Sequence, residues 1–158
     1  MARWKRKELE KAFEAYQAAA LRGAQTGDWT DWANCFTEDA TYIEHHYGKF
    51  WGREKILNWI TGTMGKWPAS EMQAFPVTWH SIDEDKGWII CEVMNRMRDL
   101  GDGEIYQEPN ITILRYAGNG QFKYEEDAYN PNNMGTMIGR WINAEKAASS
   151  DQSGTTDA

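Results

Sequence analysis

The sequence has few of the residues and spacings that would point to a metal, a nucleotide or a disulfide framework. Its 158 residues include two cysteines and three histidines, with no Cys-x-x-Cys or His-x-x-x-His unit. Because protein metal sites draw on such closely spaced ligands, we expect no bound metal. No glycine-rich loop of the phosphate-binding type joins a strand to a helix, so we also expect no nucleotide or other cofactor. The two cysteines, Cys35 and Cys91, are interpreted as small buried hydrophobic residues.

Positive charge and long apolar runs are scarce as well. The chain has 17 Lys and Arg against 24 Asp and Glu, a formal net charge of −7, which argues against nucleic acid or an anionic membrane as a partner. No apolar segment reaches the length of a membrane span, and the first residues show no signal-type apolar run. Together with the isolated cysteines, these features predict a cytoplasmic protein.

Aromatic residues, in contrast, are abundant. Nine tryptophans and seven tyrosines are unusual for a chain of 158 residues. A tryptophan ring needs close packing, and its indole N–H needs a partner when it is buried. The composition therefore predicts a large aromatic core, an aromatic-lined pocket or an aromatic interface.

Periodicity and turn signals divide the chain into an early helical part and a late strand-rich part. Helices are predicted over 4–22, 29–36 and 53–64, strands over 41–47, 75–82, 88–98, 105–116 and 122–129, and a last helix up to residue 146. This order predicts a single α+β domain over residues 1–146: a cone-shaped barrel in which a curved antiparallel sheet wraps around the N-terminal helices, with a C-terminal helix. Residues 147–158 are predicted to be a disordered tail. We expect a ligand in the mouth of the cone and a homodimer or higher homo-oligomer formed through the sheet.

Three ionisable side chains alternate on the first predicted strand. Tyr42, Glu44 and His46 share one face of an extended chain. If that face lines the cone, burial raises the pKa of Glu44 toward that of a useful general base. His46 would then shuttle the proton, and Tyr42 would donate to a developing oxyanion. The alternative is that this face meets solvent, with Ile43 on the cavity side.

The later strands carry further candidates. Asp127 ends a run of three acids that is typical of a solvated strand end, yet alternation groups it with Tyr129, a residue expected to be buried. An inward Asp127 that faces Glu44 would form a carboxyl pair with separated pKa values, suited to acid and base roles.

Polar residues in an apolar strand and two of the tryptophans complete the candidate set. Asn95 and Arg96 are adjacent, so one of them must face inward, where it needs either a structural hydrogen bond or a ligand. Trp51 and Trp79 are predicted to stack on a ligand ring, and most other tryptophans are assigned to the core.

Several short motifs, taken in order, resemble the nuclear transport factor 2-like superfamily, in particular its SnoaL-like branch. They are Gly27-Asp28-Trp29, Phe36-x-Glu38-Asp39-Ala40-x-Tyr42, Gly52-Arg53-Glu54-x-Ile56 and Glu126-Asp127-x-Tyr129-Asn130-Pro131. The resemblance covers roughly residues 8–145. It implies the cone-shaped α+β fold of ketosteroid isomerases, limonene epoxide hydrolases, scytalone dehydratases and polyketide cyclases, a fold that hosts many reactions as well as non-catalytic binding.

The resemblance also suggests roles for individual residues. Glu44 is similar in position to the carboxylate base of ketosteroid isomerases. Tyr42 and Glu44 are similar to the Tyr and Asn that orient water in limonene epoxide hydrolases, and Asp127 is similar to their late acidic residue. The Arg-x-Asp unit of those hydrolases corresponds to Arg96-Met97-Arg98, which lacks the acid. Water addition to an epoxide is therefore disfavoured.

The isomerase resemblance extends to the oxyanion site. Tyr16 is a loose counterpart of the isomerase helix-1 tyrosine, displaced by about one helical turn. Asn110 or Thr112 stands near the place of the neutral acid that donates to the oxyanion in those enzymes.

These observations predict a cofactor-independent enzyme that performs acid–base chemistry on a hydrophobic aromatic small molecule. Lyase-type elimination or retro-aldol cleavage is favoured over isomerisation and cyclisation, because the water-clamping Arg-x-Asp unit is absent. Lignin-derived diarylpropanoids, the substrates of formaldehyde lyases in the same superfamily, are one candidate substrate class. The alternative is a non-catalytic module that binds a hydrophobic ligand or a protein.

Overall fold

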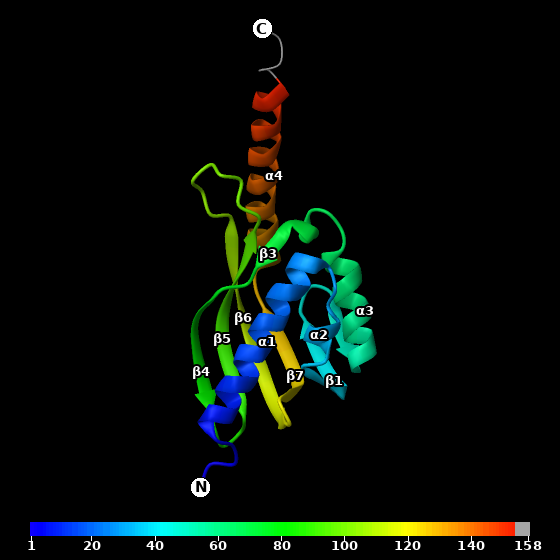
Figure 1. Ribbon diagram of the computed structural model, residues 1–158, viewed down its shortest axis with the longest axis vertical. Coiled ribbons are helices and arrows are strands. Elements are labelled where there is room, and N and C mark those ends of the chain that lie inside the picture. The colour runs from blue at the N-terminus through cyan, green and yellow to red at the C-terminus, as the bar shows by residue number, and fades with distance from the viewer. Residues whose placement is uncertain (154–158) are drawn as a thin grey trace.

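The computed structural model describes residues 1–153, which form four α-helices around one seven-stranded curved sheet (Figure 1). The helices are α1 (Arg6–Thr26), α2 (Thr30–Ala33), α3 (Arg53–Met64) and α4 (Pro131–Ser153), with a short 3-10 helix at Ala69–Glu71. The strands are β1 (Phe36–Glu44), β2 (Gly48–Trp51), β3 (Met72–Ala74), β4 (Val77–Asp83), β5 (Trp88–Met97), β6 (Gln107–Gly118) and β7 (Gln121–Ala128). The α+β class is confirmed, and the predicted helices and strands occur in the predicted order, with the short strands β2 and β3 in addition. No helix within residues 1–153 is long and apolar enough to cross a membrane.

The sheet joins the first and last strands of the chain. Its order is β2-β1-β7-β6-β5-β3, and β4 also pairs with β5. All pairs are antiparallel except β1 and β7, which run parallel. This parallel pair departs from the fully antiparallel sheet that we expected. Its consequence is that β1 lies beside β7, so acidic residues distant in sequence become neighbours.

Two predicted strands differ clearly from those in the structure. The first begins at Phe36, within the helix predicted over 29–36, and ends at Glu44 instead of continuing to Tyr47, because residues 45–47 form a turn that leads into β2. The strand predicted over 75–82 begins only at Val77, and the short strand β3 precedes it. Pro76 lies between the two strands, and proline has no N–H to donate to a ladder.

The helical layer packs on the concave face of the sheet. In α1, the stripe Leu9, Phe13, Tyr16 and Ala20 is buried against the core, and the helix ends at Gly27 in the left-handed conformation with φ 76°. Gly23 in the same helix allows the Trp29 ring to approach: a Cβ at this position would lie 2.6 Å from a ring carbon. The α1–α2 corner therefore depends on a residue without a side chain.

Helix α4 closes one end of the sheet and then continues beyond it (Figure 1). Met137 and Trp141 are buried in a second hydrophobic cluster with Met72, Met97 and Tyr106. The helix continues to Ser153, through residues for which we predicted a disordered tail. Alanine, glutamate and lysine at 144–148 are good helix formers and explain this extension. Residues 154–158, the rest of the predicted tail, lie outside the described residues.

Candidate functional site

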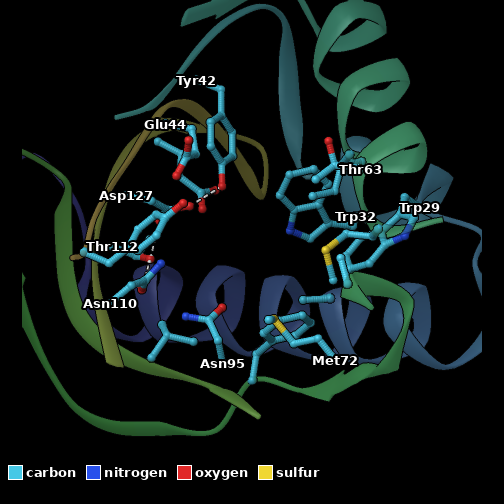
Figure 2. Close-up of a pocket in the computed structure, with 18 of the residues that line it drawn as sticks. Trp29, Trp32, Tyr42, Glu44, Thr63, Met72, Asn95, Asn110, Thr112 and Asp127 are labelled. Carbon is cyan, nitrogen blue, oxygen red and sulfur yellow. Dashed lines mark hydrogen bonds between the residues drawn. The ribbon is translucent and has the colours of Figure 1, made fainter. Parts of the chain in front are cut away.

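A cavity of about 200 Å³ lies between the concave face of the sheet and the helices. This volume exceeds more than tenfold the roughly 10–15 Å³ that a single ordered water requires. Figure 2 shows that its two walls differ in chemistry: Tyr42, Glu44, Asp127, Thr112 and Asn110 gather on one side, and Trp29, Trp32 and Met72 lie across from them. We call these the polar wall and the apolar wall.

The polar wall is built by the register of β1, β7 and β6. Tyr42 pairs with Glu125, and Glu44 pairs with Asp127, in the parallel β1–β7 ladder. Because side chains alternate along a strand, this register places all four on the concave face. On the other side of β7, Asp127 pairs with Thr112 of β6. Three carboxyl groups thus line one cavity, and Glu44, Glu125 and Asp127 are only 4%, 2% and 8% exposed.

Asp127 is held by two hydroxyl donors. Tyr42 donates its phenolic proton to Oδ2, and Thr112 donates from Oγ1 to Oδ1 over 2.6 Å. Burial raises the pKa of Asp127 to about 6, although these two hydrogen bonds act in the opposite direction. The charge of Glu44 contributes to this rise. Asp127 is therefore a carboxylate whose pKa lies close to neutral pH, as a general base requires.

Glu125 lies beside Asp127 and has a different protonation preference. Tyr16 donates to its Oε1 over 2.7 Å, and its Oε2 is buried with no hydrogen-bond partner among residues 1–153. Burial, followed by the charge of Asp127, raises the pKa of Glu125 well above its ordinary value. These two causes favour a neutral carboxylic acid at Glu125 beside an ionisable Asp127, the arrangement in which two carboxyls take opposite roles.

Glu44 has a structural role that the sequence did not reveal. Its Oε2 accepts hydrogen bonds from the backbone N–H groups of His46 at 2.9 Å and Tyr47 at 2.5 Å. The carboxylate thereby caps the turn between β1 and β2, in the manner of side chains that bond to the backbone two or three residues ahead. Tyr129 stands near this group: burial, followed by its interaction with Glu44, raises the pKa of the Tyr129 hydroxyl.

The apolar wall consists of interlocking aromatic rings. The centroids of Trp29 and Trp32 are 5.7 Å apart at 86°, and Trp32 reaches the polar wall through Tyr42 at 5.9 Å. Trp59 of α3 packs against Tyr42 at 4.9 Å and stacks on Phe50 at 4.6 Å. The three tryptophans line the cavity, whereas the sequence analysis assigned most tryptophans other than Trp51 and Trp79 to the core.

Most of the candidate residues named from the sequence come together here. The cavity is lined by Tyr16, Tyr42, Glu44, Asn95, Asn110, Asp127 and Tyr129. This resolves the orientation of the first strand, since Tyr42 and Glu44 face inward.

Four candidates lie elsewhere, and for them the expected placement is wrong. His46 is exposed in the turn after β1, because the strand ends before the alternation reaches it. Trp51 and Trp79 are 60% and 46% exposed and do not line the cavity. Arg96 is absent from the lining, since Asn95 is the inward residue of that pair. The Arg96 Nε donates instead to Gln107 Oε1 over 2.9 Å.

Glu125 is the residue that sequence reasoning missed. It was interpreted as part of a solvated acidic strand end. The signal that could have identified it is alternation: if Asp127 points inward, so does the residue two positions earlier.

A model of the SnoaL-like domain matches residues 6–127. The chain belongs to the SnoaL-like family. Its fold is shared with three proteins of known structure, each at low sequence identity. The first is an epoxide hydrolase from M. tuberculosis resembling the limonene enzyme, with 14% identity over 90% of this chain and 93% of that chain and a TM-score of 0.65. The second is a proposed polyketide cyclase from Xanthomonas campestris, with 16% identity over 84% of this chain and 98% of that chain and a TM-score of 0.65. The third is a proposed isomerase from Bacillus subtilis, with 15% identity over 84% of this chain and 94% of that chain and a TM-score of 0.64.

At these identities the likeness establishes the fold and not the reaction. No curated protein matches the sequence of this SnoaL-like domain. The reaction must therefore be argued from the cavity itself.

Proposed function

We propose that this SnoaL-like protein is a cofactor-independent lyase that acts on a hydrophobic aromatic small molecule. The observation that carries the proposal is the pair Asp127 and Glu125, two carboxyls on one strand in one cavity whose surroundings favour different protonation states. Such a pair supplies a base and an acid from the protein alone.

Asp127 is the proposed base. It lines the cavity, its pKa is about 6, and Tyr42 and Thr112 fix its orientation. Glu44, the base suggested by the resemblance to ketosteroid isomerases, already accepts two backbone hydrogen bonds as the cap of a turn. Because those bonds hold the carboxyl group in place, Glu44 is assigned to shaping the site.

Glu125 is the proposed acid. In a lyase step, Asp127 removes a proton from the substrate, a C–C or C–O bond breaks, and the proton of Glu125 goes to the atom that gains the electron pair. The sum is a retro-aldol cleavage if the proton taken is that of a hydroxyl, and an elimination if it is that of a C–H bond. Tyr16, whose pKa burial raises strongly, remains an O–H donor to Glu125 throughout.

The choice of a lyase over a hydrolase is supported by the cavity lining. The limonene-type hydrolases use an arginine with an acid on the long strand, and here Arg96 is turned away from the cavity. Diarylpropanoids derived from lignin are a fitting substrate class, since aryl groups suit the apolar wall of Trp29, Trp32 and Trp59.

The test is turnover of a panel of aryl-substituted β-hydroxy compounds, including lignin-type diarylpropane diols, followed by mass spectrometry and by capture of released aldehyde. The expected result is that one class is cleaved by the wild-type protein and that Asp127→Asn lowers the rate about a thousandfold, within the usual range for a general base. If ligands bind but the wild-type protein and Asp127→Asn give the same background rate throughout, the second reading, a non-catalytic binding module, replaces the enzyme.

A further inference from the structure

The polar wall is unusual in how its hydroxyl protons are used. Tyr16 donates to Glu125, and Tyr42 and Thr112 donate to Asp127. A hydroxyl has one proton, so none of these three can also donate to a ligand. The groups that remain for a ligand on this wall are therefore those of its amide side chains and carboxyls.

Asn110 presents an oxygen to the cavity once its hydrogen bonds are assigned. Thr112 Oγ1 lies 2.6 Å from Asp127 Oδ1 and 3.2 Å from Asn110 Oδ1, and its one proton cannot serve both oxygens. The carboxylate is the closer and stronger acceptor and takes the single proton of Thr112. With that proton taken, two oxygens would face each other without a proton between them, so we infer that the Asn110 amide is turned by about 180° from the orientation in the structure and that its N–H donates to the Thr112 oxygen. Its carbonyl oxygen is left free.

Asn95 provides a second free acceptor. Its Nδ2 donates to the backbone oxygen of Glu108 over 3.3 Å, and none of the residues 1–153 donates to its Oδ1. In Figure 2 the amides of Asn95 and Asn110 lie at the edge of the open space, below Asp127. Two amide oxygens and one carboxylate thus form a row of acceptors.

The cavity offers no cationic side chain to an anion. None of the described residues that line it is a lysine, arginine or histidine, whereas three of them are acids. A carboxylate or phosphate on the ligand would lose its hydration and face Glu44, Glu125 and Asp127 without a cation to stabilise it.

We propose that the cavity takes a neutral aromatic alcohol with at least two hydroxyl groups and no acidic substituent. Its ring packs on the apolar wall, and its hydroxyls donate to Asn95 Oδ1, Asn110 Oδ1 and Asp127. This inference rests on the proposed function in one respect: the hydroxyl at Asp127 is the one whose proton the base removes. An ammonium group would donate to the same acceptors, and the amine probe in the experiment below tests that alternative.

The experiment measures binding and does not depend on turnover. Four probes share a phenylpropane frame: 1-phenylpropane-1,3-diol, 3-phenylpropan-1-ol, 3-phenylpropanoate and 3-phenylpropan-1-amine. Their dissociation constants are measured at pH 7 from shifts of the tryptophan indole N–H signals in two-dimensional NMR, which detects millimolar binding. We expect the diol to bind about five- to tenfold more tightly than the mono-alcohol, from one additional hydrogen bond. The carboxylate should bind at least about tenfold more weakly than the mono-alcohol.

Variants separate the acceptor row from general packing. Asn95→Leu, similar in size but without an acceptor, is expected to reduce the diol preference to about twofold or less while the mono-alcohol binds as before. Glu126→Gln, on the opposite face of the sheet, is the matched control and should leave all four constants unchanged. The proposal is overturned if the carboxylate binds as tightly as the mono-alcohol, if the diol shows no preference, or if the amine binds most tightly. A preserved diol preference without any turnover would instead refute the proposed function and leave the ligand class in place.

Discussion

The two faces of β7 teach how strongly position outweighs residue type in this protein. Glu125, Glu126 and Asp127 are consecutive acids. Glu126 points outward, where Tyr124 donates to it over 2.5 Å and His45 lies 2.8 Å away, and these hydrogen bonds lower its pKa. Its two neighbours point inward, and burial raises the pKa of both.

The difference lies in what surrounds each acid. On the outer face, electrostatic interactions with His45 and Arg115 also lower the pKa of Glu126. On the inner face, the acids meet hydroxyls, aromatic rings and one another. Glu126, whose ionised form is stabilised on the outer face away from the cavity, has no access to a substrate. Glu125 and Asp127, whose pKa values are raised inside the cavity, are available for proton transfer.

Removing the proposed base should give the largest effect. Asp127→Asn keeps the shape and the contact with Tyr42 but cannot accept a proton, so kcat/KM should fall about 10³-fold on a cleaved substrate. Glu126→Gln, the outward neighbour, should change kcat/KM less than about twofold. Equal losses in the two variants would show that the faces are not functionally distinct. In the wild-type protein the rate should rise with pH through about 6, as Asp127 loses its proton.

The proposed acid should rank second. Glu125→Gln retains an acceptor for Tyr16 but has no acidic proton, and we expect kcat to fall about 10²-fold. The variant should also lose the decrease in rate at high pH that the wild-type protein shows as Glu125 ionises. If the rate of Glu125→Gln still decreased at high pH, the role of the acid would belong to another group.

The buried base should lower stability at neutral pH. The pKa of Asp127 is about 6 in the folded protein and about 3.9 when unfolded, so its contribution favours the fold at low pH and is lost as pH rises through 6. Asn does not ionise, and we expect Asp127→Asn to raise the free energy of unfolding at pH 7 by about 1–2 kcal/mol, after the loss of carboxylate hydrogen bonds is allowed for. Urea unfolding at pH 7 and at pH 4 checks the sign: the gain should shrink at pH 4, and an equal gain at both would exclude ionisation as its cause.

Glu44 should give the smallest effect of the inward acids. Glu44→Gln keeps an oxygen that can accept from the backbone N–H groups of His46 and Tyr47, and kcat should fall less than about tenfold. A loss as large as that of Asp127→Asn, measured on the same substrate, would return the role of base to Glu44.

Much of this molecule follows from local sequence patterns. The helical stripe of Leu9, Phe13 and Tyr16 and the alternation in β5 are visible without a structure, because each reports a period set by the chain itself. The alternation in β1 likewise predicted that Tyr42 faces the cavity, and the alternative, in which Ile43 faces the cavity, is wrong.

What the sequence did not give depends on contacts between distant segments. The parallel pairing of β1 with β7 joins residues about 80 positions apart, as in Glu44 and Asp127, and no local pattern encodes it. The turn after Glu44, which removes His46 from the site, depends on a carboxylate bonding to backbone ahead of it. Glu125 was missed for a different reason: a run of acids suggested solvent, whereas alternation within the run decides which acid is buried.

The most direct measurement is a carbon-13 NMR pH titration of the glutamate carboxyl groups, with Glu125→Gln and Glu126→Gln to assign the two signals. The account predicts that the Glu125 carboxyl titrates well above the ordinary pKa of a glutamate, whereas Glu126 titrates below it. If both carboxyls titrate together near that ordinary value, the cavity does not hold an acid beside its base, and the proposed chemistry fails.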